Sequence, residues 1–127
     1  MSPVPDDIRR FVIQRVPSVP YIEAVLLMRD NRHCAWSAAV LARRLYLGLE
    51  ETTQLLERLR ADQLVVEEGG NGPGFRYAPA SPEVEGIWDR LAVVYAQHLI
   101  EVSTLIHTRP AGKAQMLADA FVWRKGK

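Results

Sequence analysis

The feature that most constrains the fold is a glycine-rich hexapeptide, GGNGPG at positions 69–74, between two runs of β-forming residues. LVVEE precedes it and FRYAP follows it. Turn residues rich in glycine between apolar β formers are typical of a β-hairpin, and Pro79 ends the second strand because it has no N–H for a strand ladder. The tip lacks the Lys-Ser/Thr ending of a phosphate-binding P-loop, so we interpret it as a turn.

Two helix-forming segments precede this hairpin, SAAVLARRLYLG at positions 37–48 and EETTQLLERLRADQ at positions 50–63. Ser37 is a typical N-cap for the first segment, and Gly48 is a typical residue to end it. The 3–4 residue spacing of its apolar side chains turns Val40, Leu41 and Leu45 inward. Two short helices joined by a tight turn that contains glycine are the signature of a helix-turn-helix.

Further helices are expected on both sides of this region. Residues 82–107 have the spacing of one helix of about 26 residues, which is about 39 Å long, and residues 111–125 predict another. A chain of 127 residues has the length of a single domain. We therefore predict one mainly α domain with one β-hairpin, composed of N-terminal helices (1–36), a helix-turn-helix with its hairpin (37–79) and C-terminal helices (80–127).

Composition and charge limit the possible functions. No apolar run reaches the 18 or so residues of a membrane span, the start MSPVPDDIRR lacks the layout of a secretory signal, and Cys34 is the only cysteine. We expect a cytoplasmic protein without an intrachain disulfide. Sixteen basic and fifteen acidic side chains give a net charge of +1. Because phosphate contacts supply much of the affinity for nucleic acids, a basic surface here has to come from local sorting of charge.

Residues 37–79 resemble the winged helix-turn-helix domains of bacterial transcription regulators of the MarR and ArsR types. The matching stretches are SAAVLARRL, YLGLE, ETTQLLERLRADQLV and VVEEGGNGPGFRYAP. The resemblance implies a recognition helix at residues 50–61, with Thr52, Leu56 and Leu59 facing the core. It also implies a homodimer that regulates transcription by binding double-stranded DNA through Arg43, Arg44, Glu51, Thr53, Gln54, Leu55, Arg58, Asn71 and Arg76.

The charges of the same region support an alternative function. Residues 48–79 contain six acidic side chains and three arginines, and acidic groups repel nearby phosphates. Leu55 is apolar at a position that the resemblance turns toward the groove. The alternative is a winged-helix module that binds a protein partner and no DNA.

The expected long helix carries an apolar stripe that is broader than one partner helix requires. One possibility is that the stripe packs entirely against the chain's own core. The other is that part of it pairs with the same helix of a second subunit, and we expect this homodimer. The pairing residues would be Ile87, Leu91, Val94, Tyr95, Leu99, Val102, Leu105 and Ile106.

No pattern predicts catalysis, a metal site or a cofactor. His33 and Cys34 are adjacent, which is a poor spacing for two ligands of one metal. His98 and His107 are nine positions apart, so they would lie on opposite sides of one helix. No sequence cue assembles a Ser-His-acid triad, and no effector ligand is indicated. We expect a protein that is not an enzyme.

Overall fold

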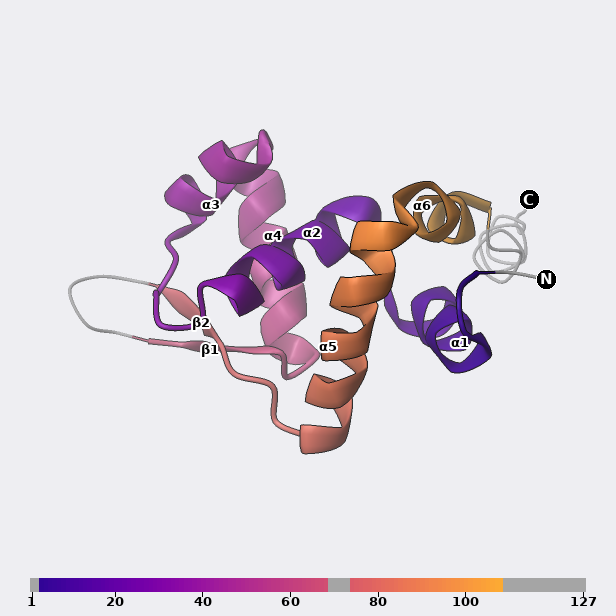
Figure 1. Ribbon diagram of the computed structural model, residues 1–127. Helices are drawn as coiled ribbons and strands as arrows, with labels where there is room; N and C mark the ends of the chain where they lie inside the picture. The colour runs from indigo at the N-terminus through magenta and orange to yellow at the C-terminus, as the bar shows by residue number, and fades with distance from the viewer. Residues whose placement is uncertain (1–2, 69–73, 109–127) are drawn as a thin grey trace, which may run out of the picture. The chain divides into compact units, whose positions relative to one another are not determined.

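The computed structural model describes residues 3–68 and 74–108 (Figure 1). These residues are mainly helical with one antiparallel two-stranded hairpin, which confirms the predicted mainly α class with a β-hairpin. In chain order the elements are α1 (Asp6–Arg15), α2 (Val19–Asp30), α3 (Ala38–Leu45), α4 (Leu49–Ala61), β1 (Val65–Glu67), β2 (Phe75–Tyr77), α5 (Pro82–Gln97) and α6 (Leu99–Thr108). Within this described part, no single helix is both long and apolar enough to cross a membrane.

The chain forms two compact units. The first, Val19–Ala92, is continuous in the sequence, and we call it the continuous unit. The second combines Met1–Ser18 with Val93–Lys127, and we call it the terminal unit. Of the terminal unit, the structure describes residues 3–18 and 93–108.

Helix α2 lies in the middle of the continuous unit, between α3, α4 and α5 (Figure 1). A helix with buried side chains on several sides is covered all round, and α2 buries Tyr21, Ile22, Ala24, Val25 and Met28. Other elements complete this core with Leu41, Leu56, Leu59, Val65, Phe75, Tyr77, Trp88 and Leu91. The ring centroids of Tyr21 and Trp88 are 6.3 Å apart, so aromatic packing links α2 to α5.

The hairpin packs one face on this core. Val65 lies opposite Tyr77 and Glu67 opposite Phe75 in the antiparallel register, and Val65, Tyr77 and Phe75 are buried. The other edge of β2 pairs with Trp36 in the segment between α2 and α3. The Trp36 N–H donates to the Phe75 carbonyl at 2.7 Å, and the Phe75 N–H donates to the Trp36 carbonyl at 2.8 Å. This bridge was not predicted from the sequence.

The terminal unit contains α1 and α6, which pack against each other. Ile8 and Val12 of α1 are buried, as are Val102 and Ile106 of α6. The four-residue spacing of each pair places its two side chains on one face of the helix. These two faces form the described part of the unit's core.

The single helix expected over residues 82–107 was wrong, because α5 ends at Gln97 and α6 begins at Leu99. Two backbone hydrogen bonds bridge the break, from the His98 N–H to the Val94 carbonyl at 2.7 Å and from the Val102 N–H to the His98 carbonyl at 3.0 Å. Apolar periodicity reports which side of a helix is buried. The same spacing of buried side chains can continue across a break between two helices, so it does not predict where one helix ends and the next begins. The helix expected at residues 111–125 lies outside the described residues.

Candidate nucleic-acid interface

The connection between α3 and α4 is three residues long, at positions 46–48. Ser37 caps α3 as predicted, because its hydroxyl accepts a hydrogen bond from the Val40 N–H at 3.2 Å. Tyr46 ends α3 with a left-handed backbone at φ 58°. Gly48 precedes α4 as its N-cap, so the prediction that Gly48 ends α3 was wrong. A residue of any type ends a helix when it adopts the left-handed conformation, although glycine does so most easily.

The inner face of α4 carries the three residues expected there. Thr52, Leu56 and Leu59 are at most 1% exposed, so the expected core face of this helix is confirmed. The Thr52 hydroxyl donates to the Gly48 carbonyl at 2.8 Å, which satisfies this buried polar group within the first turn. The opposite face of α4 is therefore the one available to a partner.

The expected inner face of α3 was only partly right. Leu41 is buried and Leu45 is half-buried, but Val40 is 39% exposed. Ala42 is buried in its place. The helix has only eight residues, and its inward direction is centred on Leu41 and Ala42, which leaves Val40 at the edge.

The predicted contact residues on α4 lie mostly on its outer face, where Glu51, Thr53, Gln54 and Arg58 are exposed and Leu55 is half-buried. The Thr53 hydroxyl donates to the Leu49 carbonyl of its own helix at 2.9 Å. Arg58 lies 3.0 Å from the Asp62 carboxylate, and Arg60 lies 2.7 Å from that of Glu57. Both arginines of α4 thus already have an acidic partner, Glu57 on the same helix and Asp62 at its C-cap.

The hairpin arginine is paired in the same way. Arg76 of β2 lies 2.9 Å from the Glu68 carboxylate, across the two strands. Asn71, the other contact predicted for the hairpin, lies outside the described residues. The predicted phosphate contact of Arg76 would therefore compete with an existing ion pair.

Arg43 and Arg44 on α3 differ from these arginines. Both are exposed, and neither has a carboxylate partner among residues 3–68 and 74–108. The Arg44 guanidinium carbon lies 5.5 Å from the centroid of the Trp36 ring, which is within cation–π range. Arg44 is thereby held between α3 and the segment that pairs with β2. The uncompensated positive charge of the predicted site is at the end of α3.

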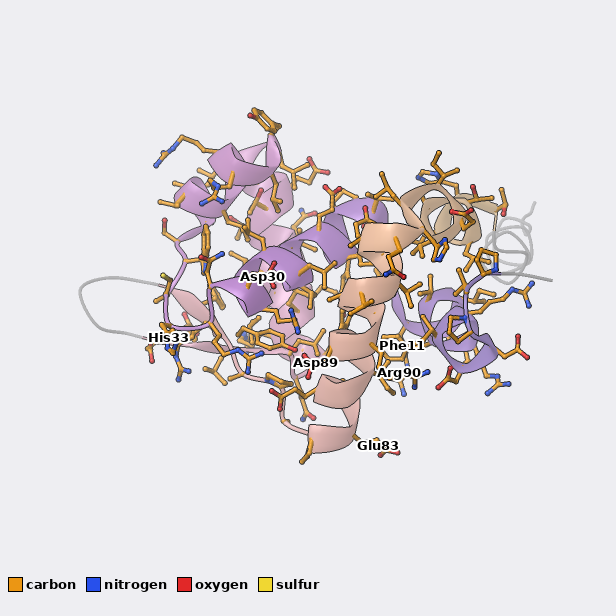
Figure 2. The ribbon with its side chains drawn as sticks, viewed as in Figure 1. Phe11, Asp30, His33, Glu83, Asp89 and Arg90 are labelled. Atoms are coloured by element: carbon orange, nitrogen blue, oxygen red, sulfur yellow. The ribbon has the colours of Figure 1, made fainter. Side chains whose placement is uncertain are left out.

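A polar junction that the sequence did not reveal fastens α5 within the continuous unit. Arg29 of α2 lies 2.8 Å from the Asp89 carboxylate, and Arg32 lies 3.0 Å from that of Glu85. Figure 2 shows Asp89 on the side of α5 that faces α2, with Arg90 on the other side. The hydrogen bond with Asp89 raises the pKa of Arg29 against the opposing effect of burial.

Tyr77 of β2 lies at the same junction. The Arg32 guanidinium carbon is 5.3 Å from the centroid of its ring, and its buried hydroxyl has no hydrogen-bond partner within the described part of the chain. Burial, followed by the nearby charges of Asp89 and Glu85, raises the pKa of Tyr77 to about 12. These contacts join the end of α2 to β2 and α5 within the continuous unit.

The residues predicted to pair two subunits are largely used inside the chain. Leu91, Tyr95, Val102 and Ile106 are buried, Ile87, Val94 and Leu105 are half-buried, and Leu99 is 50% exposed. These four side chains pack within the chain, and Leu99 is the most exposed of the residues predicted to pair with a second subunit. Other exposed apolar side chains of this region are Val93 and Ile100, at 57% and 75%.

Comparison with family models, with curated proteins and with solved structures gives no match. A function has therefore to be argued from the site itself. Within the described ranges, no group of three His, Cys, Asp or Glu residues could hold a metal ion. The features that bear on function are the α3–α4 connection, the exposed face of α4 and the charged side chains around them.

Proposed function

We propose that this protein is a winged-helix transcriptional regulator that binds double-stranded DNA as a homodimer. Two short helices joined by three residues and followed directly by a hairpin support the proposal. The observation that carries it is the exposed pair Arg43 and Arg44, which lack a carboxylate partner in the described part of the chain and lie beside the exposed start of α4.

In this proposal α4 is the recognition helix and enters the major groove. Gln54 is its best base-reading side chain, because an amide can bond in bidentate fashion to adenine. Two copies would place their α4 helices in successive major grooves, about 34 Å apart. Arg43 and Arg44 would supply the first phosphate contacts from the end of α3.

Arg58 of α4 and Arg76 of β2 are already in ion pairs, so we expect them to contribute less to DNA binding than Arg43 and Arg44. Exposed ion pairs contribute only about 0–1 kcal/mol, so a phosphate can displace Asp62 or Glu68. The displaced carboxylate then remains near the phosphate and repels it, which reduces the gain. The continuous unit has eight arginines and eleven acidic side chains, a net charge of −3. We therefore expect few phosphate contacts and a shallow dependence of affinity on salt.

The proposal is tested by titrating a pool of random duplexes at about 50 mM salt and following fluorescence anisotropy. Binding below about 10 μM protein is expected, and selection from the pool should enrich a site with two half-sites one helical turn apart. A protein that leaves the pool unbound at about 100 μM is not a DNA-binding protein, since nonspecific binding alone reaches that range.

The second candidate function is a winged-helix module that binds another protein. It is favoured by the exposed apolar side chains at the α3–α4 connection, where Val40, Tyr46 and Leu49 are 39%, 94% and 58% exposed. Apolar patches of this kind are typical of protein interfaces. Proximity labelling in cells with the wild type and with Leu49→Asp, followed by reconstitution of purified candidates, distinguishes this function. A purified partner that binds the wild type and Leu49→Asp equally would contradict it.

A further inference from the structure

Tyr46 combines two unfavourable features in one residue. Its side chain is 94% exposed, so a large aromatic ring is in water. Its backbone has φ 58° and ψ 46°, a left-handed conformation that is an outlier for a bulky residue and easy for glycine. The left-handed backbone ends α3, but the tyrosine side chain is not needed for this, since glycine at this position would end the helix equally well.

Gln63 is the matched case within the same unit. It is the other described residue apart from glycine with a positive φ, at 64°, and it directly follows Asp62, the C-cap of α4. Its N–H donates to the Arg60 carbonyl at 3.0 Å, and the next N–H, of Leu64, donates to the Leu59 carbonyl at 3.0 Å. Gln63 is exposed too, but its side chain is polar. Of these two left-handed residues, Tyr46 is therefore the one that exposes an aromatic ring.

The charges near Tyr46 indicate which partner the ring meets. Five of the eight arginines in the continuous unit are paired with carboxylates, namely Arg29, Arg32, Arg58, Arg60 and Arg76. Arg43 and Arg44, three and two positions before Tyr46, have no such partner in the described ranges. A phenol that can donate a hydrogen bond thus lies next to uncompensated positive charge. This combination suits an anionic partner with apolar parts, such as the sugar-phosphate backbone of DNA.

We propose that Tyr46 anchors the DNA backbone at the α3–α4 connection. Its hydroxyl donates a hydrogen bond to a phosphate oxygen, its ring packs against a deoxyribose, and Arg43 and Arg44 supply the charge. This inference rests on the proposed function and deepens it, because it places the main backbone contact at the end of α3. Arg58 and Arg76 become secondary contacts.

The experiment compares Tyr46→Gly with Gln63→Gly. Both variants should raise the melting temperature by about 2–4 °C, since each replaces a left-handed residue by glycine. In anisotropy titrations with a random duplex, Tyr46→Gly should bind about tenfold more weakly, because hydrogen bonds to charged groups are strong. Gln63→Gly should bind like the wild type. Tyr46→Phe, which keeps the ring, should have an intermediate affinity.

A salt series separates the ring from the arginines. The slope of log affinity against log salt should stay unchanged in Tyr46→Gly and become shallower by about 0.9 in Arg43→Ala. If the wild type binds DNA and Tyr46→Gly binds equally well, the anchor is disproved while the proposed function stands. If Tyr46→Gly melts at a lower temperature, Tyr46 has a structural role and the inference is wrong. If the wild type does not bind DNA, the proposed function is disproved, and the inference about Tyr46 is disproved with it.

Discussion

Arg29 and Asp89 join α2 to α5 through a hydrogen bond of 2.8 Å between Nε and Oδ1. The same guanidinium also lies 2.9 Å from Asp30, its neighbour in the sequence. The two carboxylates differ in exposure, at 45% for Asp89 and 64% for Asp30. Only the contact with Asp89 connects two elements of the fold.

Asp89→Ala is expected to lower the free energy of unfolding by about 1 kcal/mol, because it removes a charge-assisted hydrogen bond between helices. Asp30→Ala is the matched control and should cost less than about 0.5 kcal/mol, since exposed ion pairs between neighbours contribute little. Urea denaturation measures both. Equal losses would mean that the junction does not fasten α5.

The raised pKa of Tyr77 predicts that the folded protein loses stability at alkaline pH. Its pKa is about 12 in the folded protein and about 10 in an unfolded chain. Below pH 10 both states keep the proton, but between pH 10 and 12 the unfolded state releases it while the folded state retains it. Stability should therefore fall as the pH rises through this window, by about 2–3 kcal/mol in total.

Tyr77→Phe is the control for this effect. At pH 7 it should change stability by less than about 0.5 kcal/mol, because the buried hydroxyl has no partner in the described residues. Urea denaturation between pH 9 and pH 11.5 should then show a flatter dependence in the variant. A variant with the same alkaline loss as the wild type would assign that loss to other groups.

The two faces of α4 should respond differently to truncation. Leu59→Ala should cost about 2–5 kcal/mol, because Leu59 is fully buried and its removal leaves a cavity. Leu55→Ala should cost less than about 1.5 kcal/mol, since Leu55 is half-buried. Denaturation midpoints measure the difference. Similar losses at both positions would place Leu55 in the core and remove it from any binding surface.

The arginines should separate into two classes in DNA binding. Arg43→Ala is expected to reduce the salt slope by about 0.9, which is the contribution of one phosphate contact. Arg58→Ala should change it by less than half as much, because Arg58 is already neutralised by Asp62 at 3.0 Å. A larger effect at Arg58 would mean that DNA displaces Asp62 and that α4 supplies the main phosphate contact.

Local sequence patterns were enough to predict the hairpin and the Ser37 cap. Glycine content, capping residues and apolar spacing act over a few residues, so they can be read without the fold. The resemblance correctly placed Thr52, Leu56 and Leu59 inward. These features determine the outline of the continuous unit.

The features that were missed depend on long-range contacts or on unusual backbone. The Trp36–Phe75 bridge and the Arg29–Asp89 pair join residues far apart in the chain, which local spacing cannot reveal. Tyr46 was missed because glycine is the expected residue at a left-handed helix end. The ion pairs of Arg58 with Asp62 and of Arg76 with Glu68 could be found only from the structure. Because of these ion pairs, we assign the main phosphate contacts to the arginines of α3.

The division into two units has a consequence for how the chain folds during synthesis. Every core residue of the continuous unit lies between positions 19 and 92, so this unit can fold while later residues are still being added. Helix α1 is translated before the continuous unit, yet Ile8 and Val12 lack their partners Val102 and Ile106 until α6 has been made. Helix α1 is therefore translated before the continuous unit but buries its apolar face only after that unit has been made.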